Sequence, residues 1–215
     1  MVARIRGYRL KVVLPGNVSV ERRTMLKVFG AEIIPSPAEE GSNGAVRLAL
    51  RLVDENPDWV LLYQYANEAN PRVHYETTGP EIWNQTTGTI DGFICAVGTG
   101  GTLAGTSKYL KERSKKVKIG LADPMGAALY NYYVNGELKS EGSSITEGIG
   151  QGRITANLED LLVDMPYQIP DEEMLPILFD LIMRFTTTCV RNSYPRKSYE
   201  NHRHPYGEAD RPRLP

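Results

Sequence analysis

The sequence predicts an α/β fold built on parallel strands, and two observations carry that prediction. Short β-rich runs alternate with stretches of helical periodicity over the first 125 residues. Strands joined by helices of this length are typical of βαβ units, whose strands lie parallel. The second observation is a glycine-rich loop, Gly98-Thr99-Gly100-Gly101-Thr102, between an apolar run and a helical stretch. Such a strand–loop–helix order is typical of the same fold class.

The chain opens with two strands and the helix between them. Residues 10–14 are β-rich and end at a Pro-Gly turn. Ser19 is expected to cap a helix that runs to Phe29, with Gly30 as its C′ residue. Residues 31–34 form the second predicted strand, which closes at the prolines after it.

A second helix and a third strand follow. Apolar residues recur at i, i+3, i+4 and i+7 in Val46, Ala49, Leu50 and Val53, which indicates a helix. An Asn-Pro pair ends it, and residues 59–63 are then expected to form the third strand.

The next segment leads into the glycine loop and out of it. Residues 71–84 have a helical spread of apolar positions that we expect Gly79-Pro80 to break. Residues 92–97 are apolar without alternation, as in a strand buried on both faces. After the loop come a predicted helix over 103–115 and a mostly buried strand over 117–122.

The last third of the chain has less regular patterning. Residues 123–164 are rich in glycine and serine, and a loop of that length is usually functional or disordered. Asp171 is expected to cap a helix that ends near Phe185. We therefore divide the chain into residues 1–70, part of a smaller α/β domain, 71–185, part of a larger one, and 186–215, an atypical disordered tail.

Composition excludes several classes of function. The formal net charge of -1 gives no reason to expect nucleic acid or a membrane as partner, and no apolar run is long enough to span a bilayer. Cys95 and Cys189 are too few for a disulfide framework, so we expect reduced thiols and a cytoplasmic protein. An organellar presequence stays open, because the first 20 residues lack acidic side chains. We expect no metal site, since His202 and His204 lie in a tail without a scaffold.

The glycine loop, residues 98–102, is the candidate binding site of the chain. Unpaired N–H groups at a helix start, together with the helix dipole, bind anions, and glycines let a phosphate approach them. Thr99 and Thr102 add hydroxyl groups. The loop has no lysine, which excludes a Walker A motif, and Leu103 stands where a dinucleotide fingerprint needs glycine. The loop is therefore predicted to hold a single phosphate, the alternative being a tight turn that binds nothing.

Distinctive short motifs are spread along the chain, at residues 20–23, 30–34, 64–67, 69–71, 74–82, 97–102, 126–130 and 147–152. Through these motifs, which stand in family order, the chain from residue 7 to residue 182 resembles cysteine synthase (O-acetylserine sulfhydrylase), a fold-type II pyridoxal-phosphate enzyme. The resemblance implies a three-layer, tryptophan synthase β-like fold with mostly parallel sheets, present here incompletely.

The resemblance implies a cofactor and a reaction. In the family, the loop matching Gly98, Thr99, Gly100, Gly101 and Thr102 holds the phosphate of pyridoxal 5'-phosphate, which makes residues 71–185 the cofactor-binding domain. The glycine matching Gly148 lines the cofactor face, and the glutamine matching Gln64 receives the substrate carboxylate. The reaction is a β-replacement, in which acetate leaves O-acetylserine and sulfide adds to give cysteine. The family also forms homodimers and binds serine acetyltransferase.

The resemblance also predicts what this chain lacks. The family lysine that forms the Schiff base belongs to a Ser-Val-Lys-Asp-Arg-like segment upstream of the part matching Gly7, and the substrate-binding asparagine loop precedes it too. Residues 186–191 replace the family segment that supplies a serine to the pyridine nitrogen. We do not expect Lys11, Lys108 or Lys111 to substitute.

We therefore expect a chain truncated at both ends that has no catalytic lysine and makes no cysteine alone. One alternative is a non-catalytic remnant that binds a phosphate ligand or serine acetyltransferase, and another is a fragment without a stable fold. The choice between O-acetylserine and O-phosphoserine as substrate stays open, with the resemblance favouring the former.

Overall fold

The computed structural model describes the backbone of residues 1–193 and the side chains of residues 1–184. The described chain forms two compact units, Met1–Glu68 and a second that begins at Ala69. All strand pairs in both units are parallel, which confirms the predicted α/β class. Among the described helices, none is long and apolar enough to cross a membrane.

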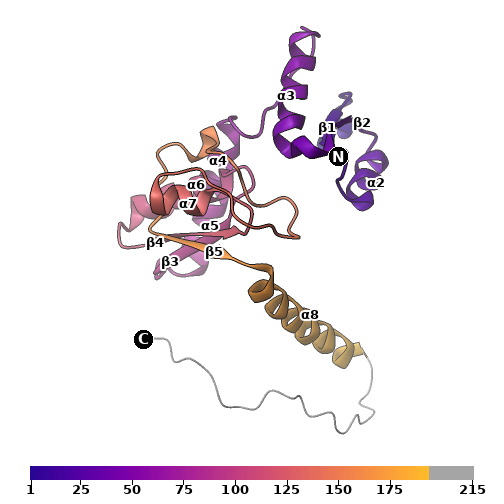
Figure 1. The fold of residues 1–215 in the computed structure, drawn as a ribbon. Helices are drawn as coiled ribbons and strands as arrows, with labels where there is room; N and C mark the ends of the chain where they lie inside the picture. Colours follow the sequence, from indigo (N-terminus) through magenta and orange to yellow (C-terminus); the bar gives the residue numbers. More distant parts are fainter. Residues whose placement is uncertain (194–215) are drawn as a thin grey trace. The chain divides into compact units, whose positions relative to one another are not determined.

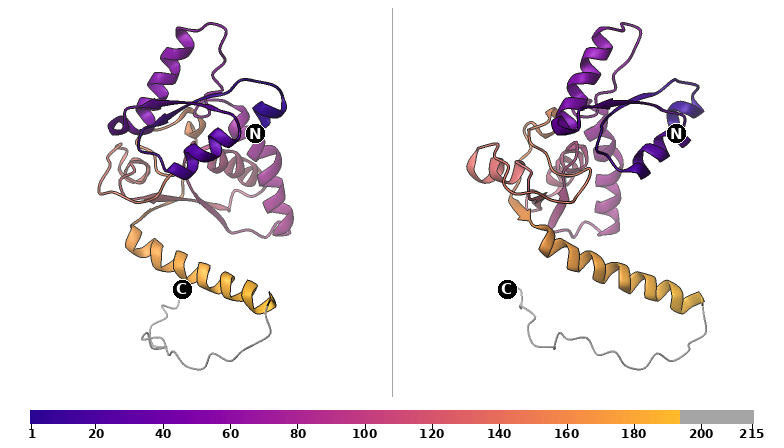
Figure 2. Two further views of the ribbon diagram at one scale, coloured as in Figure 1. Left: turned by 90° about the vertical axis from the view of Figure 1, so that its right-hand side faces the viewer. Right: turned by 45° about the vertical axis from the view of Figure 1, so that its right-hand side comes forward.

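The first unit is a small βαβα arrangement whose two strands appear in indigo in Figure 2. Its strands pair in parallel, with Val12 opposite Ile33 and Val13 opposite Ile34. The two predicted strands and both predicted helices are confirmed. The elements, in order, are α1 (Val2–Ile5), β1 (Lys11–Pro15), α2 (Val20–Val28), β2 (Glu32–Ser36), η1 (Ala38–Glu40) and α3 (Gly41–Asp54).

The third predicted strand, residues 59–63, is wrong. The segment has no strand hydrogen bonding, and Val60 and Leu62 are 84% and 70% exposed. A strand requires a partner, and β1 and β2 pair only with each other in the described chain. The segment instead ends in a turn at Tyr63, whose carbonyl accepts the N–H groups of Ala66 and Asn67, both at 3.0 Å.

The second unit has a three-stranded parallel sheet in the order β3-β4-β5, with helices joining the strands (Figure 1). The carboxyl ends of all three strands therefore meet at one edge of the sheet, where α/β proteins bind their ligands. Its elements are α4 (Ala69–Val73), η2 (His74–Thr78), α5 (Gly79–Gln85), β3 (Gly92–Ala96), α6 (Gly101–Arg113), β4 (Lys118–Pro124), α7 (Leu129–Asn135), η3 (Ala156–Leu158), β5 (Met165–Ile169) and α8 (Asp171–Ser193).

The core of this unit lies around β4 and α6. The fully buried leucine and isoleucine side chains are Leu110, Ile119, Leu121 and Leu129, and Leu103 is nearly so. The prediction of a mostly buried strand over residues 117–122 is confirmed, because β4 is the central strand. The prediction that residues 92–97 are buried on both faces is wrong. Their strand, β3, lies at the sheet edge, and Ile94 is 52% exposed.

The helical stretch after Ala69 is not broken at Gly79-Pro80, contrary to expectation. It widens to a π-helix over His74–Thr78 and continues as α5, with Pro80 in the first turn. Proline has no N–H to donate to the preceding turn, and here that turn is the wide π-helix, so the helix continues with one backbone hydrogen bond fewer. Gly79 lies against Tyr109 of α6, where a Cβ would come within 2.6 Å of the Tyr109 Cβ.

The glycine-rich stretch, residues 123–164, has little regular structure, as expected, but it contains the short helix α7. Strand β5 was missed by the sequence analysis. Asp171 begins helix α8, but its carboxylate accepts the Ser144 hydroxyl at 2.5 Å and the Ile145 N–H at 2.8 Å. Asp171 thus ties this stretch to the start of α8.

Helix α8 continues past Phe185 to Ser193. The rest of the predicted tail, with His202 and His204, lies outside the described residues, as does the side chain of Cys189.

Candidate phosphate-binding site

The glycine loop joins the carboxyl end of β3 to the amino end of α6. Gly100 adopts a left-handed conformation, with φ 90°, and its carbonyl accepts the Ala104 N–H at 2.9 Å. In the described part of the chain, the N–H groups of Gly101, Thr102 and Leu103 donate to no backbone carbonyl. These groups carry the positive end of the helix dipole, so the loop presents donors to an anion.

Close packing explains the glycine at two loop positions. A Cβ on Gly98 would lie 2.6 Å from the carbonyl oxygen of Gly148, and a Cβ on Gly100 would lie 2.6 Å from Cγ of Leu158. The Gly150 N–H donates to the Val97 carbonyl at 2.8 Å. The fold thus brings the segment around Gly148 against the start of the loop.

Thr99 is the most firmly held residue of the loop. Its hydroxyl accepts a hydrogen bond from Nδ2 of Asn70 at 2.8 Å. Its carbonyl accepts the Thr155 hydroxyl at 2.8 Å and Nδ2 of Asn157 at 2.9 Å. Thr155 and Asn157 are buried polar residues from the end of the glycine-rich stretch. That stretch therefore fixes the loop from one side, while α4 fixes it from the other.

Thr102 has a partner on the π-helix. Its hydroxyl lies 3.1 Å from Nε2 of His74, and Nδ1 of the same ring lies 3.0 Å from the Thr78 hydroxyl. The Thr102 side chain is exposed, whereas the histidine is half-buried. A network of side chains from α4 and η2 therefore sets both threonine hydroxyls of the loop.

Four residues of this network were not predicted from the sequence: Asn70, His74, Thr155 and Asn157. The first two belong to motifs of the resemblance, yet neither was expected to contact the loop. Thr155 and Asn157 follow Thr99 by more than 50 positions, and a pattern of that range has no local signal.

Gln64 belongs to the first unit, where it lies in the turn that follows Tyr63 with its side chain exposed. Its role toward a substrate carboxylate stays a proposal.

The three lysines weighed as substitutes for the family's Schiff-base lysine each interact with another side chain. Lys11 pairs with Glu32 at 3.1 Å and lies over the Trp59 ring. Lys108 lies 5.6 Å from the Tyr75 ring centroid, and Lys111 pairs with Asp164 at 2.8 Å. The Lys111 ammonium is the main reason that the pKa of Asp164 is lowered. Burial raises the pKa of the Cys95 thiol to about 11, which disfavours the thiolate, the reactive form of cysteine.

Asp123 lies one residue before the end of β4, and its carboxyl group is fully buried. Its Oδ2 accepts the Tyr130 N–H at 2.9 Å, whereas Oδ1 has no partner in the described structure. Burial raises the pKa of this carboxyl, and backbone hydrogen bonds from Tyr130 and Leu129 oppose the shift. Asp123 thus fixes the start of α7 at the sheet edge that also carries the glycine loop.

A raised folded-state pKa makes stability fall as pH rises from the unfolded value through the folded one, because the folded state holds the proton more tightly. We therefore expect Asp123→Asn to gain stability relative to the parent protein as pH rises above about 4, the ordinary pKa of an aspartate. Urea unfolding at a series of such pH values measures the difference. Asp91→Asn, at an exposed position, is the control for the exchange of a carboxyl group for an amide. A constant difference between Asp123→Asn and the parent across these pH values would contradict the expectation.

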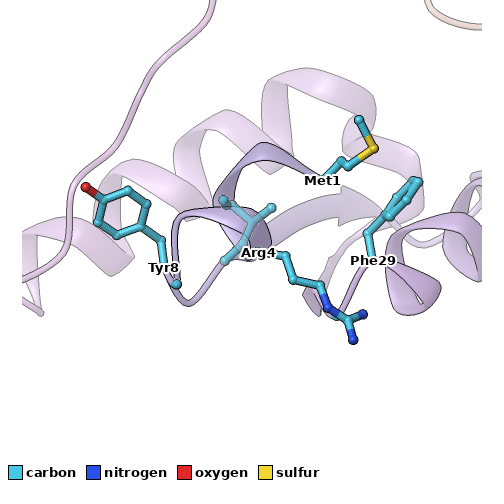
Figure 3. A pocket seen from close by; sticks show the side chains of 8 residues that line it. Met1, Arg4, Tyr8 and Phe29 are labelled. Atoms are coloured by element: carbon cyan, nitrogen blue, oxygen red, sulfur yellow. The ribbon is translucent and has the colours of Figure 1, made fainter.

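A separate hollow of about 260 Å³ lies in the first unit, and Figure 3 shows Met1, Arg4, Tyr8 and Phe29 around it. The Arg4 guanidinium donates to the Val28 carbonyl at 2.9 Å, and its side chain lies beside Gly30. Arg4 thereby satisfies a carboxyl-terminal carbonyl of α2, a favourable place for a cation.

Comparison with known proteins identifies the group to which this fold and loop belong. Residues 1–182 match the family described as pyridoxal-phosphate dependent enzyme. The chain belongs to that family. Its members depend on pyridoxal phosphate, so the predicted cofactor class is confirmed. The resemblance to cysteine synthases is confirmed by the relatives that follow.

The chain is 47% identical over 189 residues to cysteine synthase 1 of Neurospora crassa, covering 83% of this chain and 49% of that protein. It is 42% identical over 177 residues to cysteine synthase A of Escherichia coli K12, covering 81% and 55%. The chain therefore spans about half the length of the curated relatives it matches.

Solved structures of related enzymes have a similar fold. An O-acetylserine dependent cystathionine beta-synthase from Helicobacter pylori matches with a TM-score of 0.72 and 33% identity, over 80% of this chain and 54% of that one. A cysteine synthase from Entamoeba histolytica matches with a TM-score of 0.69 and 33% identity, over 79% and 48%. The fold-type II assignment is thereby confirmed, with partial coverage of each neighbour.

The residues present fit the phosphate of the family's cofactor. The amino end of α6 offers N–H groups without backbone acceptors, and the two threonine hydroxyls are held in place beside it. Glycines at positions 98 and 100 allow the approach of Gly148 and Leu158 that shapes the loop. A phosphate dianion needs several donors, and the loop offers backbone N–H groups and two threonine hydroxyls.

Proposed function

We propose that this chain carries the phosphate-binding part of a cysteine synthase, the enzyme that replaces the acetate of O-acetylserine with sulfide to give cysteine. The carrying observation is the Gly98–Thr102 loop, held by Asn70, His74, Thr155 and Asn157 at the amino end of α6. The likeness to cysteine synthases at 42% and 47% identity supports the reaction class.

When bound, pyridoxal phosphate supplies an electron sink for the bonds broken and formed at the substrate. The residues of this chain hold and orient that group. In the proposal, the N–H groups of Gly101, Thr102 and Leu103 bind the phosphate, with Thr99 and Thr102 as further donors. Gly148 lines the cofactor face next to Gly98, and Gln64 receives the substrate carboxylate.

A Schiff base needs a lysine, and no Ser-Val-Lys-Asp-Arg-like segment occurs in the 215 residues. Lys11, Lys108 and Lys111 pair with other groups. We therefore propose that this chain binds the cofactor through its phosphate and makes no cysteine by itself. A cytoplasmic location, a homodimer and an association with serine acetyltransferase are proposed on the same family likeness.

Binding and turnover measurements on the purified 215-residue chain test the proposal. Pyridoxal phosphate should bind reversibly and be displaced by inorganic phosphate, whereas pyridoxal, which lacks the phosphate, should bind at least tenfold more weakly. Equal binding of the two compounds would show that the loop is not a phosphate site. Gly136→Ala, at an exposed turn remote from the loop contacts, serves as the control variant.

Mixing the chain with O-acetylserine, sulfide and pyridoxal phosphate should yield no cysteine. Cysteine formation, or a cofactor adduct that borohydride traps on a lysine, would contradict the proposed loss of the covalent step. A pull-down with serine acetyltransferase then separates the partner-binding alternative from a chain that binds the cofactor alone.

A further inference from the structure

We propose that Asn70 and His74 are positioning residues that turn the two threonine hydroxyls of the glycine loop into hydrogen-bond donors toward a phosphate. The inference rests on the proposed phosphate site and adds the residues that set the direction of its hydrogen bonds. It assigns His74 one tautomer, with the proton on Nε2.

The Thr99 hydroxyl is oriented by a single side chain, Asn70. A hydroxyl has one proton to donate and two lone pairs to accept with. The Thr99 hydroxyl accepts from the Asn70 amide at 2.8 Å, so its own proton stays available. The Thr99 carbonyl is occupied by Thr155 and Asn157, which prevents the residue from turning. Thr99 is therefore a fixed donor.

His74 forms a chain between two hydroxyls, Thr78 at Nδ1 and Thr102 at Nε2. A neutral imidazole carries one N–H, so this chain has two possible directions. With the proton on Nε2, Thr78 donates to Nδ1, Nε2 donates to Thr102, and the Thr102 proton is left for a ligand. In the opposite direction, Thr102 donates to the ring and turns only lone pairs toward the ligand.

Phosphate oxygens accept hydrogen bonds, and they are repelled by the lone pairs of a hydroxyl oxygen that does not donate. A dianion at the loop therefore favours the first direction, in which Thr102 and Thr99 both donate. The two threonines then act alike: each accepts from a side chain of the α4–η2 stretch and donates to the phosphate. The shared arrangement comes from two different residue types, an amide and an imidazole, on successive turns.

Packing keeps the histidine at this place. A Cβ on Gly105 of α6 would overlap the Pro71 carbonyl and would lie 2.9 Å from the His74 Cβ. The π-helix over His74–Thr78 carries both the ring and the hydroxyl that faces its Nδ1. A wide turn of this kind inside a helix is common at functional sites.

The tautomer of His74 tests the inference, with inorganic phosphate present as the dianion that favours a proton on Nε2. Long-range proton–nitrogen NMR on the 215-residue chain at about pH 8.5, where an ordinary imidazole is neutral, distinguishes the two tautomers. His74→Gln identifies the resonances by their loss, since His202 and His204 also contribute. A proton on Nε2, alone or together with one on Nδ1, supports the inference. A proton on Nδ1 alone overturns it.

Phosphate affinity gives the second readout, with pyridoxal phosphate and inorganic phosphate as probes. Thr102→Val and His74→Phe should each weaken binding about tenfold, the size expected for one lost hydrogen bond to a charged group. The double variant should bind the two probes no more weakly than Thr102→Val alone, because the histidine acts through the Thr102 hydroxyl. His74→Gln, whose amide reaches the position of Nε2, should bind within about threefold of the parent protein.

If the double variant lost affinity by the product of the two single losses, His74 would only support packing, and the inference would be overturned. Thr77→Val is the matched control, since Thr77 lies on the same turn but bonds the Val73 carbonyl, at 2.6 Å. If the parent chain binds neither probe, the proposed function fails. If it binds both probes while the His74 ring carries its proton on Nδ1 alone, the proposed function stands and the present inference fails.

Discussion

Replacing Gly100 with alanine is expected to destabilise the second unit by about 3 kcal/mol and to abolish phosphate binding. Two costs add in this estimate. A left-handed conformation at φ 90° costs an alanine about 1 kcal/mol. The new methyl group would also lie 2.6 Å from Cγ of Leu158 and 3.2 Å from the Thr155 hydroxyl, and overpacking of this kind costs about 1–3 kcal/mol.

Gly136→Ala separates those two costs. Gly136 has a similar φ of 78°, but a Cβ there meets nothing within 4 Å. It should lose only about 1 kcal/mol and keep full affinity for pyridoxal phosphate. Urea unfolding and cofactor titration on both variants make the comparison. Equal destabilisation of the two variants would mean that Leu158 and Thr155 do not confine the loop.

Gly105→Ala is expected to destabilise the protein by about 2 kcal/mol, although alanine is the better helix former by about 1 kcal/mol. Gly105 lies inside α6, where a Cβ would overlap the Pro71 carbonyl and crowd the His74 Cβ. Helix α4 and the π-helix must then move away from α6. Asn70 and His74 move with them, so affinity for pyridoxal phosphate should also fall, by about tenfold.

Lys108→Ala controls for helix propensity, because Lys108 is exposed on the same helix. It should change stability by less than about 0.5 kcal/mol and leave cofactor affinity unaltered. For Gly105→Ala, the decisive result is whether the free energy of unfolding measured in urea falls or rises. A more stable Gly105→Ala protein would show that the contact between the two helices yields, and that Asn70 and His74 do not depend on it.

Local signals predicted most of the regular elements. The strands of the first unit, α2, α3, α6 and β4 follow from residue type and period within windows of 5 to 15 residues. The cofactor class followed from motifs spread along the chain in family order, and the family match over residues 1–182 confirmed it.

The failures share one physical cause. Residues 59–63 have the composition of a strand, but a strand forms only where another strand offers hydrogen bonds. The apolar run at residues 92–97 does not reveal that its strand lies at a sheet edge, with Ile94 half-exposed. Both depend on which segments lie beside them, and composition carries no such information.

The loop shows the same division at the site itself. Glycines before a helix predict an anion site, since that property belongs to the backbone of five consecutive residues. The groups that orient the loop come from residues 28 to 58 positions away, namely Asn70, His74, Thr155 and Asn157. The sequence by itself predicted an anion-binding loop and indicated the family to which the chain belongs. Only the tertiary structure decided which side chains hold its hydroxyls, because hydrogen-bond partners at that range are set by packing rather than by neighbouring residues.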